Sequence, residues 1–107
     1  SKLPHPVDIY ETDNGLGLDI ACTGIPKEDI EILIEDNTIK IHYNKLPSDK
    51  KEVEYLHKGI AKRSFHLGWK IDNKYELSKA SAEFVNGLLQ VTIPLAKGKE
   101  TKKLKIK

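Results

Sequence analysis

Apolar and polar residues alternate with a period of two along most of this chain. Because successive side chains of a strand point to opposite faces of a sheet, this pattern is typical of strands with one buried face. The first two hairpins are predicted at 7–22 and 30–43, each with a turn of Asp, Asn or Gly residues. A helix over 27–34 is the competing interpretation for part of the second hairpin. The three isoleucines of that segment favour the strand, because their spacing lines one face of a strand but spreads around a helix.

The second half of the chain combines a long polar loop with further strands. The alternation weakens over 45–59, where we predict a loop with one short strand inside it. Residues 65–71 alternate as a core strand, and a last hairpin follows over 80–93 with Asn86-Gly87 at its turn. About eight short strands and no long helical stretch predict an all-β fold, an immunoglobulin-like antiparallel β-sandwich.

Length and composition limit the chain to one domain. With 107 residues, of which 38% are hydrophobic and 32% charged, it is long enough for an ordinary core without metals or disulfides. The single cysteine, Cys22, lies in an apolar alternation, so we expect it to be buried and the chain to occupy a reducing, cytoplasmic compartment. No apolar run approaches the roughly 20 residues of a membrane span, and we expect no membrane partner.

The positive charge of the chain is concentrated at its C-terminal end. The net charge is +2, but residues 96–107 contain six lysines and one glutamate. Residues 1–95 contain twelve basic and fifteen acidic residues and therefore carry a charge near −3. Because there is no large positive field and the tail has no interleaved aromatics, we expect no nucleic-acid partner.

Residues with catalytic or metal-binding chemistry are scattered. The histidines occur singly, and the sequence has no Cys-x-x-Cys, no His-x-His and no Gly-x-Ser-x-Gly. The glycines of Asn14-Gly15-Leu16-Gly17 lead into a strand, so they indicate a hairpin and not a phosphate-binding loop. We predict no catalytic residues, no metal and no cofactor, and hence a binding protein and not an enzyme.

The last predicted hairpin carries the most specific motif in the chain. Its form, A-x-x-x-N-G-x-L, resembles the signature of the α-crystallin domain of the small heat shock proteins. The residues of the motif are Ala82, Asn86, Gly87 and Leu89. Two more segments agree in order and distance: 24–30 resembles the family element G-x-x-K-E-D-I, and 55–65 is similar to the bacterial inclusion-body-binding branch. In one departure, Leu67 stands where the family pattern F-x-R-x-F has its arginine.

The resemblance implies a domain division and a function. Residues 1–6 would be a residual N-terminal arm, 7–95 the α-crystallin domain, and 96–107 a C-terminal extension. The implied function is that of an ATP-independent holdase of the stress response, a chaperone that binds partly unfolded clients and prevents their aggregation. The alternative is a co-chaperone or adaptor sandwich that docks on a folded chaperone. Such modules tend to carry an acidic tail, whereas this tail is basic.

The resemblance also implies self-association into a dimer and larger oligomers of dimers. A strand in the loop would pair with the first strand of the partner, and the C-terminal L-x-I anchor would bind a groove between 30–34 and 79–84. The implied dimer residues are Val53, Tyr55 and Leu56 on the loop and Val7 and Ile9 on the acceptor strand. The implied groove residues are Ile32, Ile34 and Ser81, and those of the anchor are Leu104 and Ile106. The alternatives are a loop without a pairing role, isoleucines that serve only the core, and a tail with two chance apolar residues.

Overall fold

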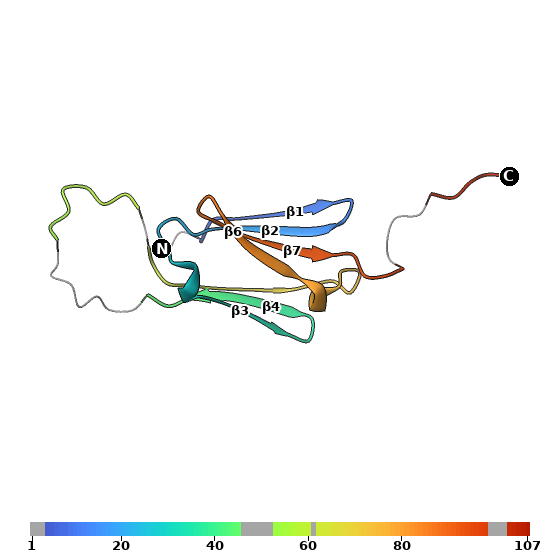
Figure 1. The fold of residues 1–107 in the computed structure, drawn as a ribbon, viewed down its shortest axis with the longest axis horizontal. Coiled ribbons are helices and arrows are strands. Elements are labelled where there is room, and N and C mark those ends of the chain that lie inside the picture. Colours follow the sequence, from blue (N-terminus) through green and yellow to red (C-terminus); the bar gives the residue numbers. More distant parts are fainter. Residues whose placement is uncertain (1–3, 46–52, 61, 99–102) are drawn as a thin grey trace.

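The chain folds as two antiparallel sheets packed face to face, which confirms the predicted sandwich (Figure 1). The computed structural model describes residues 4–45, 53–60, 62–98 and 103–107. One sheet has the order β1-β2-β7-β6 and the other the order β3-β4-β5. The strand bounds in chain order are β1 Val7–Thr12, β2 Gly15–Ala21, β3 Ile30–Glu35, β4 Thr38–Tyr43, β5 Phe65–Lys70, β6 Ser81–Val85 and β7 Leu88–Pro94.

The three predicted hairpins are present as β1–β2, β3–β4 and β6–β7. The competing helix over 27–34 is wrong. Only a single 3-10 turn, η1 (Lys27–Asp29), forms there, and β3 begins directly after it. Pairing with β4 explains the outcome, because the strand lays all three isoleucines against the apolar face of its neighbour. A second 3-10 turn, η2 (Leu77–Lys79), precedes β6.

The core is formed by the inner faces of the central strands. Leu18 and Ile20 of β2, Ile39 and Ile41 of β4 and Ile93 of β7 are almost completely buried. Cys22 is buried as predicted, and burial raises the pKa of its thiol. The alternation seen in the sequence therefore corresponds to the inner and outer faces of the two sheets.

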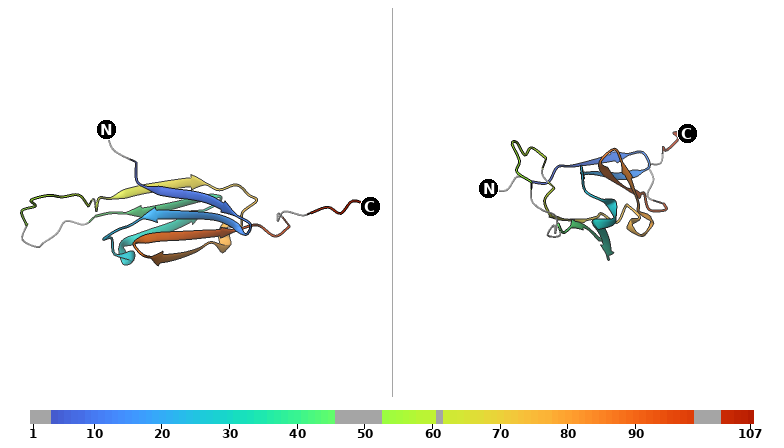
Figure 2. Two further views of the ribbon diagram at one scale, coloured as in Figure 1. Left: turned by 90° about the horizontal axis from the view of Figure 1, so that it is seen from above. Right: turned by 60° about the vertical axis from the view of Figure 1, so that its left-hand side comes forward.

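The sandwich has two open sides, and each is formed by two edge strands, one from each sheet. β1 and β5 lie along one side, and β3 and β6 lie along the other (Figures 1 and 2). An edge strand has a row of backbone N–H and C=O groups without a strand partner in its own sheet. Residues 53–60 lie beyond one end of the sandwich and residues 103–107 beyond the other (Figure 2).

The short strand predicted inside the long loop does not form in the single chain. Residues 53–60 adopt no strand conformation, and residues 46–52 lie outside the described residues. The described part of the chain therefore has seven strands instead of about eight. A strand needs a neighbour to satisfy its backbone groups, and among the described residues no strand lies beside this segment. Its pairing with a partner chain stays a prediction.

Candidate functional site

Large apolar side chains are exposed in four segments of the described chain. These are strand β1, strand β3, the loop between β4 and β5, and the C-terminal tail. The residues are Ile9, Tyr10, Leu33, Ile34, Val53, Tyr55, Leu56, Ile60, Leu104 and Ile106. Three of the segments contain residues implied for the dimer contact or the anchor, and β3 contains one implied for the groove. The candidate site is therefore a set of open edges and extensions, not a single pocket.

On β1, the two residues implied for the dimer contact lie on the inner side of an edge. Ile9 is in register with the buried Leu18, so it points toward the other sheet, yet it is 51% exposed. Val7 is partly buried. The reason is the unequal width of the sheets: four strands pack on three, and β1 is not fully covered. An extended segment laid along β1 would reach both its free backbone groups and these side chains.

The loop presents its apolar residues to solvent. Val53 and Tyr55 are exposed, and Leu56 is completely so. The ammonium nitrogen of Lys58 lies 5.1 Å from the centroid of the Tyr55 ring, a cation–π contact. Burying a Val or Leu side chain contributes about 1.5–3 kcal/mol, so these residues have a substantial free energy to gain from a partner surface.

The isoleucines of β3 belong to the core and also to an open edge. Ile32 pairs with Ile41 and Ile34 with Ile39, so both point to the core. Ile32 is partly buried, but Ile34 remains 46% exposed because no strand lies outside β3 in the sheet. These residues therefore pack against the core and are still reachable from the open side.

The assignment of Ser81 to the same lining is wrong. Ser81 pairs with the exposed Thr92, whereas Ala82 pairs with the buried Val91. Because side chains alternate across a strand, Ser81 lies on the outer face of β6 and Ala82 on the inner face. Ser81 borders a polar hollow there that also includes Tyr10. The residues on the inner face of β6 are Ala82 and Phe84.

The signature motif is explained by the β6–β7 hairpin. Asn86 and Gly87 have φ values of 52° and 79°, the left-handed conformation that a tight hairpin turn needs. The carbonyl of Gly87 accepts a hydrogen bond of 2.8 Å from the backbone N–H of Cys22, which joins the turn to the end of β2. Leu89 is buried in the core. The motif therefore fixes one hairpin and does not itself form a binding site.

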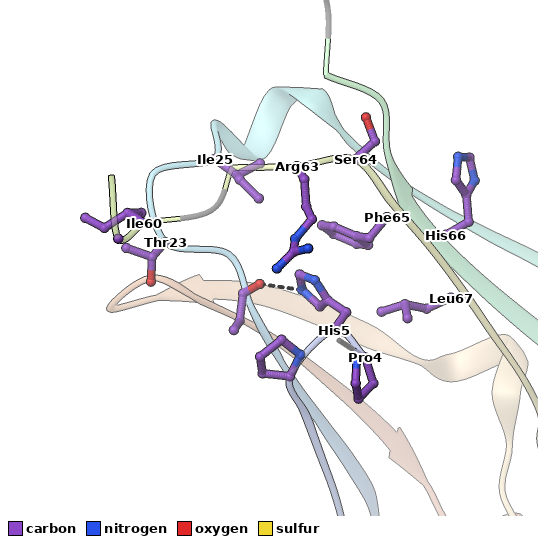
Figure 3. A pocket seen from close by; sticks show the side chains of 13 residues that line it. Pro4, His5, Thr23, Ile25, Ile60, Arg63, Ser64, Phe65, His66 and Leu67 are labelled. Carbon is purple, nitrogen blue, oxygen red and sulfur yellow. Dashed lines mark hydrogen bonds between the residues drawn. The ribbon is translucent and has the colours of Figure 1, made fainter. Parts of the chain in front are cut away.

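A cavity that the sequence did not reveal lies between the segment before β1, the end of β2 and the start of β5 (Figure 3). Its volume is about 640 Å³. The ring of His5 stacks on that of Phe65 at 4.2 Å, and its Nε2 donates a hydrogen bond of 2.7 Å to the carbonyl of Ala21. Leu67 lines the cavity, and Arg63 extends over it. The cavity joins residues far apart in the chain, so no local pattern predicts it.

The outer face of the three-stranded sheet carries a row of polar side chains. Nε2 of His42 lies 3.2 Å from Oε1 of Glu31, and the rings of His42 and His66 stack at 5.3 Å. Nε2 of His66 lies 3.0 Å from Oδ1 of Asn44. Among the residues that the structure describes, no three His, Cys, Asp or Glu side chains are grouped so that they could hold a metal ion.

A second polar cluster ties the end of β1 to the segment before η2. The hydroxyl of Tyr75 donates a hydrogen bond to Glu11, and Nζ of Lys74 lies 3.0 Å from the same carboxylate oxygen. The hydrogen bond from Tyr75 and then the contact with Lys74 lower the pKa of Glu11. The bond to Glu11 also raises the pKa of Tyr75. This cluster is structural, because it closes one end of the sandwich.

Comparison with known proteins identifies the family. The sequence model of the Hsp20/alpha crystallin family matches residues 8–107. The chain belongs to this family. Among its relatives are small heat shock protein C2 of Rickettsia felis, 30% identical over 94% of this chain and 66% of that protein, and small heat shock protein IbpB of Escherichia coli, 32% identical over 82% of this chain and 61% of that protein. The chain spans about half to two-thirds of the length of the curated relatives it matches.

Solved structures of small heat shock proteins share the fold. Heat shock protein 16.0 of Schizosaccharomyces pombe aligns with a TM-score of 0.71 and 27% identity over 99% of this chain and 100% of that one. A small heat shock protein of Xylella fastidiosa, described as having a distinct high order structure, aligns with a TM-score of 0.79 and 19% identity over 100% of this chain and 99% of that one. The resemblance of the chain to the α-crystallin domain, and its likeness to the inclusion-body-binding proteins, are thus confirmed.

The remaining family assignments can now be placed on this α-crystallin domain. The strands extend from residue 7 to residue 94, within the domain predicted at 7–95. Leu104 and Ile106 lie in an extended, exposed segment, as an anchor would require. None of the helical turns in the described ranges has the length or the apolar composition needed to cross a membrane. The roles of the loop, the edge and the tail stay predictions.

Proposed function

We propose that the chain is an ATP-independent holdase that binds partly unfolded proteins and prevents their aggregation. The observation that carries this proposal is the concentration of exposed apolar side chains on two edge strands and two extensions, beside a closed core. Unfolded clients expose apolar side chains and unpaired backbone, and the edges offer partners for both. Membership of the Hsp20/alpha crystallin family supports the same role.

Holding requires no catalytic group and no cofactor. A protein that binds the unfolded state of a client lowers the concentration available for aggregation by mass action alone. We therefore propose that the chain is not an enzyme and that it uses no nucleotide. The compartment we propose is the reducing cytoplasm, because the chain has a single cysteine and can form no internal disulfide.

We further propose that the chain assembles with itself through both open sides. The loop bearing Val53 and Tyr55 would lie along β1 of a partner, beside the overhanging Ile9. The anchor would bind the β3 and β6 side of a neighbouring dimer, where Ile34 and Ala82 lie on the inner faces of the two edge strands. Each contact would cover side chains that are exposed in the single chain.

The test is aggregation of a heat-labile client protein, followed by light scattering with and without ATP. We expect the chain to suppress scattering in proportion to its concentration and to the same extent in both conditions. Nucleotide dependence or hydrolysis would contradict the holdase proposal. A chain that is monomeric by native mass spectrometry and leaves scattering unchanged would instead support the adaptor alternative.

A further inference from the structure

The outer face of strand β3 carries a spaced pair of carboxylates at an open edge. The pairing with β4 places the isoleucines of β3 on the inner face and Glu31, Leu33 and Glu35 on the outer face. Both glutamates are exposed, and the side chain of Glu31 has 62% of its surface accessible. Because β3 is the last strand of its sheet, another extended segment can pair with it there.

The C-terminal tail has the complementary pattern. It reads Lys103-Leu104-Lys105-Ile106-Lys107, and both apolar side chains are almost completely exposed. In an extended conformation the lysines point to one side and the leucine and isoleucine to the other. The tail therefore separates charge from apolar surface as β3 does, with the opposite sign of charge.

The spacing of the two patterns also agrees. Glu31 and Glu35 are four residues apart, as are Lys103 and Lys107, which is roughly 13 Å along a strand. Laid beside β3 in this register, the tail would place its two apolar side chains next to Ile32 and Ile34. Each pattern is symmetric about its centre, so the match holds for parallel and for antiparallel pairing.

We propose that Glu31 and Glu35 of one copy select the tail of a second copy through Lys103 and Lys107, as part of a strand added to β3. The inference rests on the proposed anchoring of the tail. Lys105 would lie over Leu33, where its aliphatic stem can cover the exposed leucine. Opposite charges directly across a strand pair favour the pairing, and like charges disfavour it.

The structure favours β3 over β6 and a second copy over the same chain. On its outer face β6 offers a single carboxylate, Glu83, between Ser81 and Val85. The tail projects beyond the end of its own sandwich, away from its own β3 (Figures 1 and 2). Because residues 1–95 carry a charge near −3 and the tail is basic, two copies attract each other at this contact.

The charged part of the contact must depend on salt. An exposed cross-strand pair changes an association constant by about 1.4- to fivefold, so two pairs amount to roughly two- to thirtyfold. The Debye length falls from about 30 Å at 0.01 M salt to about 3 Å at 1 M, which screens exposed pairs but does not weaken apolar burial. We therefore expect salt to reduce the size of the assemblies.

Sedimentation velocity of the full chain at low and at high salt tests the proposal. The variants are Lys103→Glu with Lys107→Glu, Glu31→Lys with Glu35→Lys, and all four changes together. We expect each double variant to weaken association roughly tenfold at low salt and to reverse the salt dependence of the wild type, because salt then screens a repulsion between like charges. The fourfold variant exchanges the two signs, so we expect it to restore the wild-type assemblies.

Glu83→Lys is the control on the other edge of the same open side, since it makes one of the two Glu→Lys changes there, a charge change of +2 against +4 for the β3 variant. The proposal is overturned if both double variants sediment like the wild type, if the fourfold variant does not restore assembly, or if Glu83→Lys has the effect expected for β3. If Glu31→Lys with Glu35→Lys fails to fold, the salt dependence of Lys103→Glu with Lys107→Glu still tests the proposal. Leu104→Ala with Ile106→Ala separates the two proposals: if it alone dissociates the assemblies, the anchor stands and the charge selection fails.

Discussion

Leu67→Arg introduces the arginine of the family pattern F-x-R-x-F at a site that is apolar in this chain. Leu67 lies on the inner face of β5 in register with the fully buried Ile41, and it lines the cavity at the start of β5 (Figure 3). No carboxylate is among the described residues that line this cavity, and Arg63 already extends over it. A second guanidinium there would have no anionic partner and a like charge nearby.

The size of the effect follows from this environment. Leu67 is only partly buried, so its loss removes about 1–2 kcal/mol of apolar burial. Incomplete desolvation of an unpaired guanidinium adds about 1–3 kcal/mol. We expect a total of about 2–5 kcal/mol, which lowers the melting temperature of a domain of this size by roughly 10–20 °C.

The assay is thermal unfolding by circular dichroism at a fixed protein concentration, because assembly also shifts the melting temperature. Leu67→Met conserves volume and should cost less than about 1.5 kcal/mol. Lys70→Arg places a guanidinium at an exposed position of the same strand and should change stability by less than about 0.5 kcal/mol. An unchanged or raised melting temperature for Leu67→Arg would refute the reasoning and show that partners for the arginine exist.

Three further predictions concern the loop, the tail and the end of the sandwich. Deleting residues 51–57 should give a folded monomer by native mass spectrometry, because residues 53–57 have no partner strand in the described part of their own chain; a variant that stays dimeric would place the interface elsewhere. Leu104→Ala with Ile106→Ala should shift assemblies toward dimers in sedimentation; at a concentration at which both proteins are dimers it should leave the melting temperature within about 1–2 °C, since both side chains are at least 85% exposed in the single chain. Unchanged sedimentation would show that the tail is no anchor. The lowered pKa of Glu11 means that its ionised form stabilises the fold above the unfolded-state pKa of about 4.5 and that this contribution is lost as pH falls through the folded-state value. Glu11→Gln should therefore be less stable than the wild type at neutral pH and should approach it in acid; a constant difference across that range would contradict the assigned pKa.

The strands can be predicted from the sequence because the alternation of side chains and the choice of turn residues are local features. Ile39 and Ile41 alternate with polar residues and are buried, and Asn86-Gly87 adopts the left-handed conformation of its turn. The placement of Ser81 was within reach of the same reasoning. It lies between Ala80, which packs against the core just before β6, and Ala82, which shares the inner face of β6 with Phe84, so parity alone puts the serine outside.

Other features of the structure depend on contacts between elements that are far apart in the sequence, and local patterns do not predict those contacts. Val53 and Tyr55 alternate like a strand but, within the described ranges, have no strand beside them, and periodicity cannot supply the partner. The exposure of Ile9 follows from the unequal width of the two sheets, which is set by strand order and not by local pattern. The bond between Tyr75 and Glu11 joins residues 64 positions apart, and no spacing rule predicts it.

Hydrogen–deuterium exchange of the full chain with and without a heat-unfolded client, at a dilution at which the chain is monomeric and its edges are not covered by other copies, tests most directly whether the open edges hold clients. We expect added protection in β1, β3 and residues 53–60, which expose apolar side chains, and none in β2 or β7, whose backbone groups are already paired on both sides. Exchange should be the same with and without ATP. Suppressed aggregation without protection at these edges, or with protection confined to other surfaces, would contradict the account.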